Sequence, residues 1–412
     1  MRLAWGPEEE AFRAELDLFL DTHAPKQAVG LDFAASEEAG IPQWAREWQA
    51  TLFDNGWMVP GYPPELGGRN ATPVQTLVFQ EEMSSRGIQR SVHFPGWAIV
   101  APSLLEFGTE EQKKLAPAAL RGDMVWCIGM SEPNAGSDLA SLTTRAVLDG
   151  DHFVVTGQKV WTSYAMDAAK CFCYVRTNPD VPKHKGITVL IIDMDSPGID
   201  IRPLRQITGT THFAEVFFDE VPVPKENVIG AVDDGWRVTM GSLAHERGGL
   251  WLQTVAGVDH VLTDLIALAK RTGADGNQAV RRRLADTHAQ VTSLKALGYK
   301  GFSSFAQGSS APEHSYLKVA GSELQKSLFE LGMELEGPAG IVIDPDHHQA
   351  ADRWLFSFFT SFAGTIAGGT SEIQRNIIAE RVLGLPRTVD RASAGPKGRH
   401  RRPEGGGLPR GN

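Results

Sequence analysis

The hydrophobic periodicity of the chain changes twice, from helical to strand-like and back to helical. Over residues 7–120 apolar side chains recur at helical spacing. Over residues 124–224 they form short β-rich runs separated by Gly, Asp, Pro and Asn clusters. From Asp233 the helical period returns. This order predicts an α+β fold with an N-terminal helical domain, a middle antiparallel β-barrel or sandwich, and a C-terminal helix bundle.

The same pattern predicts the boundaries of these parts. We expect domains at residues 1–123, 124–231 and 232–387, followed by a basic, Gly- and Pro-rich tail at 388–412 that we expect to be disordered. The predicted strands are 152–155, 160–162, 172–176, 187–192, 199–201 and 214–218, and the predicted later helices begin at 233, 280, 315 and 348. A last helix is predicted to begin at Thr370-Ser371, with Ser371 and Gln374 as a capping box, and to stop at Gly384 and Pro386.

Charge and hydropathy exclude several classes of protein. The formal net charge of -10 and the lack of a long basic face argue against a nucleic-acid binder. No run of 18 uncharged apolar residues is present, so we expect no membrane span. The first residues lack the basic and apolar blocks of a signal peptide, and three cysteines are too few for a disulfide framework, so a cytoplasmic location is expected. Cys171 and Cys173 alternate on one strand face, which favours packing over metal binding.

Two motifs could bear on chemistry. In the segment 130–138, MSEPNAGSD, small residues, hydroxyls and loop amides are suited to an anion, although on physical grounds alone a plain turn is the better explanation. In the segment 158–163, QKVWTS, the indole of Trp161 stands beside two hydroxyls, which suits a planar heteroaromatic cofactor. Trp161 as an ordinary core anchor is the alternative.

Several long motifs in one order make the chain similar to a known family. These are GYPPELGG at 61–68, SEPNAGSDL at 131–139, GQKVWTS at 157–163, HFAEVFFDEVPVP at 212–224 and GGTSEIQRNIIAERVLGLPR at 368–387. With them the chain resembles the acyl-CoA dehydrogenases, flavoproteins, from Pro7 to Arg387. The resemblance implies N-terminal helices, a middle β-barrel and a C-terminal four-helix bundle. It also implies non-covalent FAD between barrel and bundle at a subunit interface.

The resemblance also implies roles for particular residues. Met130 and Ser131 match contacts to the flavin ring, and Ser137 matches a contact to its pyrophosphate, or to substrate. Trp161 and Ser163 match residues packed on and bonded to the isoalloxazine. Thr370 and Glu372 lie where the family closes the site over the cofactor, although Thr370 can equally cap its helix.

The position of the catalytic base is the most informative departure. Many family members carry a glutamate directly before the Gly-Thr of the closing motif, whereas this chain has Gly368 there. A second branch, which includes isovaleryl- and long-chain-type enzymes, carries the glutamate before an arginine on the first long helix of the C-terminal domain. Glu246-Arg247 matches that position. We therefore expect Glu246 to be the base, Arg247 to serve the fold or the substrate side, and the backbone N–H of Gly368 to bond the thioester oxygen.

The glycines near these positions favour a branched, cyclic or bulky acyl group, because Gly368, Gly248 and Gly249 leave room near the reacting carbons. The function implied is FAD-dependent α,β-dehydrogenation of an acyl-CoA to the trans-2-enoyl-CoA, with electrons passed to an electron-transfer flavoprotein. A homodimer, homotetramer or assembly with a paralogous subunit is implied as well. A carrier-protein-tethered substrate, oxygen as acceptor and a non-catalytic subunit are the alternatives.

Two further segments depart from the family pattern. At 270–275, KRTGAD does not reproduce an Arg-x-x-Phe-Gly segment that reaches the FAD of a neighbouring subunit. At 334–340, ELEGPAG replaces an amide by Glu334 and a glycine by Pro338. The contacts to the adenosine side of FAD are therefore in doubt, and a partner subunit is one source for them.

Overall fold

The computed structural model describes residues 5–28, 40–306, 313–341 and 351–386. Within these ranges, the side chains of 243–256, 304–306, 313–314 and 351–353 are not described. The predicted disordered tail at 388–412 and the predicted start of a helix at residue 348 therefore lie outside the described residues. In the part of the chain that can be assessed, the three-part order of helices, sheet and helices is confirmed.

Short helices form the N-terminal part, because apolar side chains at helical spacing turn one face of each helix inward. They are α1 (Pro7–His23), α2 (Gln43–Asp54), α3 (Pro73–Ser85), a π-helical turn (Gly96–Val100), α4 (Ala101–Phe107), α5 (Glu110–Lys113) and α6 (Ala116–Arg121). Thr72 begins α3 with a capping box: its hydroxyl accepts from the Gln75 N–H, and the Gln75 side chain accepts from the Thr72 N–H. Arg69 stacks on Trp57 beneath these helices, with 3.5 Å between the guanidinium carbon and the ring centroid.

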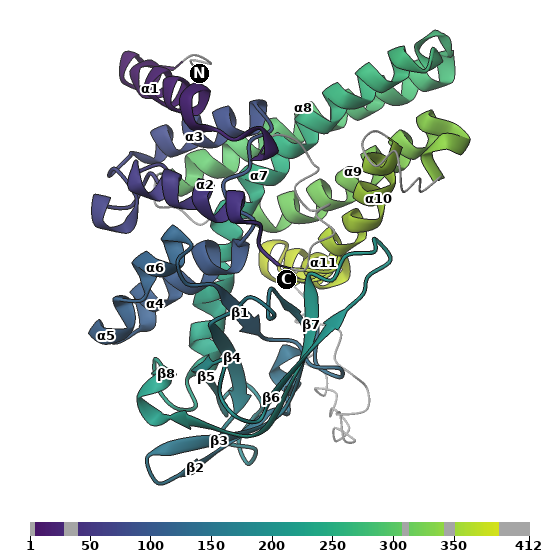
Figure 1. Cartoon of the computed structure of the whole chain (residues 1–412). Helices are drawn as coiled ribbons and strands as arrows, with labels where there is room; N and C mark the ends of the chain where they lie inside the picture. The colour runs from purple at the N-terminus through teal and green to yellow at the C-terminus, as the bar shows by residue number, and fades with distance from the viewer. Residues whose placement is uncertain (1–4, 29–39, 307–312, 342–350, 387–412) are drawn as a thin grey trace, which may run out of the picture.

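The middle part of the chain forms one curved sheet, which lies at one end of the molecule, below the helices in Figure 1. Its strands are β1 (Trp126–Gly129), β2 (Arg145–Asp149), β3 (His152–Ser163), β4 (Lys170–Arg176), β5 (Ile187–Asp193), β6 (Ile199–Leu204), β7 (Phe213–Pro224) and β8 (Val228–Ile229). The hydrogen-bonded order is β6-β7-β3-β2-β4-β5-β8, and β1 pairs with β4. The two strands predicted at 152–155 and 160–162 are one continuous strand, β3. The pairing is antiparallel except for β1 with β4 and β2 with β4.

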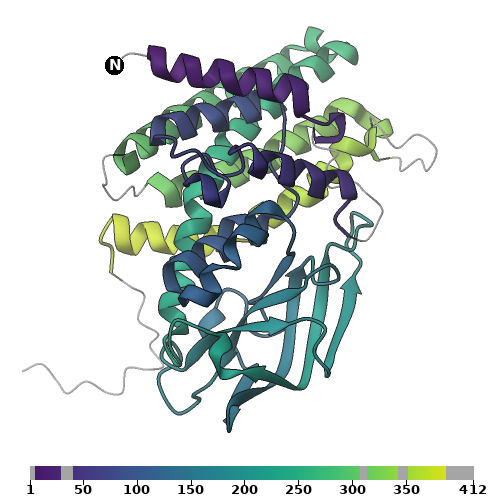
Figure 2. The ribbon, with the colours of Figure 1, turned by 60° about the vertical axis from the view of Figure 1, so that its left-hand side comes forward.

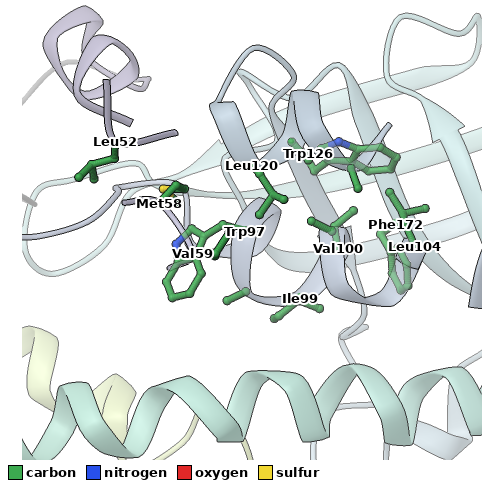
Figure 3. Close-up of a cluster of buried hydrophobic side chains, with 14 of the residues drawn as sticks. Leu52, Met58, Val59, Trp97, Ile99, Val100, Leu104, Leu120, Trp126 and Phe172 are labelled. Carbon is green, nitrogen blue, oxygen red and sulfur yellow. The ribbon is translucent and has the colours of Figure 1, made fainter. Parts of the chain in front are cut away.

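The two faces of the sheet pack into different cores because side chains alternate along a strand. On β4, Phe172 and Tyr174 face the N-terminal helices, in a cluster that also holds Trp97 and Trp126 (Figure 3). Cys171 and Cys173 face the other way, as expected from their spacing, and pack with the interior of the sheet. Both thiols are buried and free.

The C-terminal part consists of long helices that lie beside the N-terminal helices on one side of the sheet (Figure 2). They are α7 (Gly235–Arg271), α8 (Gln278–Ala306), α9 (Glu313–Glu336) and α10 (Ala351–Gly364), and α9 packs against the other three. A buried hydrogen bond of 2.8 Å between the hydroxyls of Ser103 and Ser242 joins α4 to α7. Of the described helices, none is long and apolar enough to cross a membrane.

The last helix, α11 (Ser371–Ile377), begins differently from the prediction. The N-cap is Thr370, whose hydroxyl accepts from the Ile373 N–H. The expected Ser371–Gln374 capping box is wrong, because the Ser371 hydroxyl donates to Glu323 and the Gln374 amide donates to the Gly368 carbonyl. The side chains that would have formed the box instead hold the turn before α11 against α9. The helix continues as a π-helical turn (Ile378–Val382) and stops at Gly384, as predicted.

Candidate active site

A buried ion pair ties two of the predicted motifs together. Lys159 on β3 and Glu132 in the loop after β1 are 2.9 Å apart, and their side chains are 0% and 4% exposed. Lys159 also donates to the Met130 carbonyl. Gly129 leaves room for the lysine stem and for the neighbouring thiols, because a Cβ there would lie 3.3 Å from the Lys159 Cγ and 2.9 Å from the Cys173 sulfur. This pair was not predicted, although a lysine inside a β-rich run was a signal for it.

The Glu132 carboxylate is fully bonded. Burial alone would raise the pKa of Glu132, but the Lys159 ammonium and the N–H groups and hydroxyl of Thr143 and Thr144 outweigh burial and lower the pKa to about 2. The loop at 130–132 is thereby fixed against β3, where the Val160 N–H donates to the Ser131 carbonyl at 3.0 Å.

A β-bulge decides which way Trp161 points. On β3, Lys159 pairs with Val216 and Thr162 pairs with Ala214, so β3 has one extra residue at this place. In a regular strand Trp161 would share the inward face of Lys159, whereas the bulge turns Thr162 inward instead. Trp161 takes a left-handed φ of +60° and is 59% exposed. The alternative that Trp161 is a core anchor is therefore wrong.

At the end of β3 and in the loop beside it, several hydroxyl groups make no hydrogen bond to the described residues. Of the predicted residues, Ser131 and Ser163 are partly exposed, and within the described residues neither hydroxyl makes a hydrogen bond. The hydroxyl of Thr162 is buried and has no partner there either. Trp161 meets Phe213 edge to face, with 5.9 Å between ring centroids. Ser137, by contrast, lies in an exposed part of its loop, next to Asp138, which pairs with Lys183.

A cavity of about 550 Å³ opens beside this edge. Its walls come from all three parts of the chain: α3 and the loop after it, the end of β3, the β6–β7 loop, α7 and α10. Ser163 and Phe213 stand on the sheet side, and Ile88, Trp97 and Phe359 are among the apolar residues elsewhere on the wall. Tyr164 connects the sheet to the N-terminal part of the chain. Its N–H donates to the His212 carbonyl in the β6–β7 loop, and its hydroxyl donates to the Val92 carbonyl in the loop after α3. A mostly apolar cavity of this size suits a small-molecule ligand.

The residues predicted to carry the chemistry on α7 are placed only by the backbone. Glu246 and Arg247 lie in this helix, but their side chains are among those not described. Gly257, which lines the cavity, is three turns further along α7 than Glu246. At 3.6 residues per turn the two positions share one face of the helix, roughly 16 Å apart along its axis.

The closing segment lies against α9, and its members are not among the residues that line the cavity. Lys318 donates to the Gly369 carbonyl at 2.6 Å. Gly368 and Gly369 have left-handed φ angles of +64° and +94°, which glycine adopts readily. Among the described residues, the Gly368 N–H has no acceptor. Glu372 is exposed beside the Thr370 cap.

The two altered segments pair with residues of the same chain. Glu334 forms an ion pair with Arg283, and Glu336 forms one with Arg271. The carboxylate that replaces the family amide thus joins α9 to α8, and Glu336 joins α9 to the end of α7. These side chains hold the end of the bundle together, so their replacement has a structural explanation within one subunit.

Comparison with known proteins identifies the class that this fold and site define. The profile of the acyl-CoA dehydrogenase N-terminal domain matches residues 6–123, that of the middle domain matches 127–221, and that of the C-terminal domain matches 233–383. The chain belongs to the acyl-CoA dehydrogenase family, whose members are flavoprotein oxidoreductases.

Within that family the chain is similar to mycobacterial proteins. It is 37% identical to acyl-CoA dehydrogenase IpdE1 of Mycolicibacterium smegmatis, over 93% of this chain and 99% of that protein. It is 40% identical to FadE34 of Mycobacterium tuberculosis, over 86% of this chain and 48% of that protein. Similar solved structures are the Tcur3481–Tcur3483 steroid ACAD (TM-score 0.82, 31% identity, 94% of this chain and 100% of that one) and the ChsE4–ChsE5 complex of M. tuberculosis (TM-score 0.80, 33% identity, 94% and 100%).

The described residues fit the FAD that is usual in this family. The exposed indole of Trp161 provides an aromatic face, and the hydroxyls of Ser131 and Ser163, which have no partner among the described residues, provide hydrogen-bonding groups near the cavity. The left-handed φ of Trp161 comes with the β-bulge and turns the indole outward, where its face is available to a planar ring.

Proposed function

We propose that the chain catalyses the FAD-dependent α,β-dehydrogenation of a bulky, ring-bearing acyl-CoA to the trans-2-enoyl-CoA. The observation that carries the proposal is the cavity of about 550 Å³, which places apolar walls beside the Trp161–Ser163 edge. A steroid ACAD among the similar solved structures supports the choice of a ring-bearing acyl group.

Each part of the site would have a separate task. Bound FAD would supply the hydride acceptor. Trp161 would pack on its ring, and Ser131, Ser163 and the Met130 backbone would supply hydrogen bonds, held in place by the Lys159–Glu132 pair. Thr370 and Glu372 would close the cofactor site, and Ser137 would contact the pyrophosphate or the substrate.

Glu246 would remove the α-proton of the thioester, with Arg247 serving the substrate side. The Gly368 N–H, which has no acceptor among the described residues, would donate a hydrogen bond to the thioester oxygen, where negative charge develops as the proton leaves. The proposed base, Glu246, lies on α7, and the proposed N–H donor, Gly368, precedes α11. Gly368 can therefore supply its backbone N–H although it has no side chain to act as the base.

The partners follow from the same proposal. An electron-transfer flavoprotein would reoxidise the cofactor, in the cytoplasm, and a second copy or a paralogous subunit would complete the assembly. The similarity to the ChsE4–ChsE5 complex supports a paralogous subunit. The proposal includes no nucleic acid and no membrane.

Anaerobic titration of the purified chain tests the dehydrogenation. A ring-bearing acyl-CoA, such as cyclohexylpropionyl-CoA, is expected to bleach the yellow flavin fully, and butyryl-CoA is expected to bleach it less efficiently. A colourless chain that becomes yellow only with a co-expressed paralogue would instead identify a subunit of a heteromer. Equal efficiency with both thioesters would contradict the proposed substrate class.

Replacing Trp161 by glycine should separate cofactor binding from stability. Glycine accepts a φ of +60° without strain, so we expect the free energy of unfolding of the FAD-free protein to stay equal or to rise by up to about 1 kcal/mol. Loss of the indole should weaken FAD binding by about tenfold. Flavin release and denaturant unfolding measure the two effects, and Trp161→Phe is the control that keeps an aromatic face. A variant that loses stability and keeps full FAD affinity would contradict this role.

A further inference from the structure

One charged side chain on the cavity wall has no part in the chemistry described above. Arg90 lies in the loop between α3 and the π-helical turn, and it lines the cavity. Its guanidinium carbon lies over two rings, 4.9 Å from the Phe79 centroid and 4.6 Å from the Trp97 centroid. Its Nη2 donates to the Gln80 side-chain oxygen at 3.0 Å.

This guanidinium is not neutralised by the part of the chain that the structure describes. Its Nε is buried and has no hydrogen-bond partner, and no described carboxylate lies within ion-pair distance. Among the described residues that line the cavity there is no Asp or Glu. Burial lowers the pKa of Arg90 to about 10, so the side chain still carries its charge at neutral pH.

Arg86, four residues earlier, shows the ordinary arrangement. It is paired with both Asp17 and Asp21 near the protein surface. Arg90 has instead two aromatic rings and one amide. Arg90 is partly buried, and a positive charge that loses much of its water without gaining an anion is costly, so such a site is expected to bind an anion.

The geometry also selects the kind of anion. The contacts with two rings hold the guanidinium in place, and the planar fork of a guanidinium matches the two oxygens of a carboxylate. Ser163, on the sheet side, marks the end of the cavity where the flavin ring would lie. Arg90, on the side of the N-terminal helices, marks another part of the same wall.

We propose that Arg90 is a specificity residue that binds a second carboxylate on the acyl group, remote from the thioester. The substrate class is then a ring-bearing dicarboxylic acid joined to CoA through one of its two carboxyl groups. This inference rests on the proposed dehydrogenation, because it places the thioester at the flavin end of the cavity.

The experiment compares three thioesters of 3-cyclohexylpropionic acid that differ only at ring carbon 4: carboxylate, carboxamide and methyl. For the FAD-loaded protein we expect kcat/KM for the carboxylate to exceed that for the carboxamide by about 10- to 100-fold. Arg90→Gln and Arg90→Met should abolish this preference, mainly through KM. Arg90→Lys should keep part of it, because it keeps the charge and loses the planar fork. Arg86→Gln, outside the cavity, should keep the wild-type ratio.

Direct calorimetric binding of the same three thioesters separates this inference from the proposed function. If the wild type binds the carboxylate thioester preferentially and Arg90→Gln loses that preference, the role of Arg90 is supported. This holds even if no thioester bleaches the flavin, a result that would contradict the proposed dehydrogenation alone. Bleaching by all three thioesters with an unchanged preference in Arg90→Gln and Arg90→Met would overturn the role of Arg90 and leave the dehydrogenation intact. The role of Arg90 would also be overturned if Arg90→Gln kept the preference for the carboxylate thioester but bound FAD at least tenfold more weakly. That result would assign the guanidinium to a phosphate of the cofactor.

Discussion

Glu246→Gln is expected to keep bound FAD and to lower the rate of flavin reduction by an acyl-CoA by about 10²- to 10⁴-fold, the usual contribution of a general base. Glutamine has nearly the same size as glutamate and cannot accept the α-proton. The backbone of α7 continues unbroken on both sides of position 246, so the substitution should leave the helix in place. Stopped-flow measurement of flavin bleaching under anaerobic conditions gives the rate.

Glu330→Gln is a matched control, because Glu330 is an exposed glutamate of another long helix, α9. It should reduce flavin at the wild-type rate. If Glu246→Gln bleaches its flavin as fast as this control, another group is the base. A Glu246→Gln protein that purifies without FAD would show that Glu246 serves cofactor binding instead.

Lys159→Met is expected to lower the free energy of unfolding by about 3–5 kcal/mol, because it leaves the buried Glu132 carboxylate without its cation. FAD binding should weaken with it, since the Met130–Glu132 loop loses its connection to β3. Denaturant unfolding with the cofactor removed measures the first effect. The double variant Lys159→Met/Glu132→Gln should recover part of the loss, because it removes both charges.

Lys113→Met is the control for this prediction. Lys113 pairs with Glu110 at the surface, and removal of such a pair changes stability by less than about 1 kcal/mol. An effect of Lys159→Met as small as that of Lys113→Met would contradict the role of the buried pair.

The pair also predicts a dependence on pH. The folded-state pKa of Glu132 is about 2, below its ordinary value of 4.5, so its stabilising contribution is complete above pH 4.5 and is lost as the pH falls toward 2. The difference in stability between wild type and Lys159→Met should therefore shrink over that interval.

The overall fold could be predicted because it depends on periodic burial. Helical spacing in α1 and α7 and the short apolar run of β4 appear directly in the sequence, and the structure has the same elements there. The start of α11 could not be predicted to the residue. Thr370 and Ser371 are both good caps by composition, and Glu323 on α9, far away in the chain, decides between them by binding Ser371.

The roles of the site residues come from the family motifs and stay predictions. The motifs named Ser131, Trp161 and Ser163, but the direction of Trp161 depends on a bulge that is visible only when β3 is paired with β7. Arg90 could not have been found from the sequence, because an arginine in a loop is ordinarily solvated. Its position between Phe79 and Trp97 depends on how α3 packs against the π-helical turn.

The buried cysteines can report local opening of the sheet. All three thiols, Cys127, Cys171 and Cys173, are buried on β1 and β4, so an alkylating reagent reaches them only when this part of the sheet opens. The rate of their modification would then report the free energy of opening beneath the Met130–Glu132 loop, with and without FAD. A cysteine introduced at the exposed Ser137 would react at once, giving a single labelling position on an otherwise silent wild-type background.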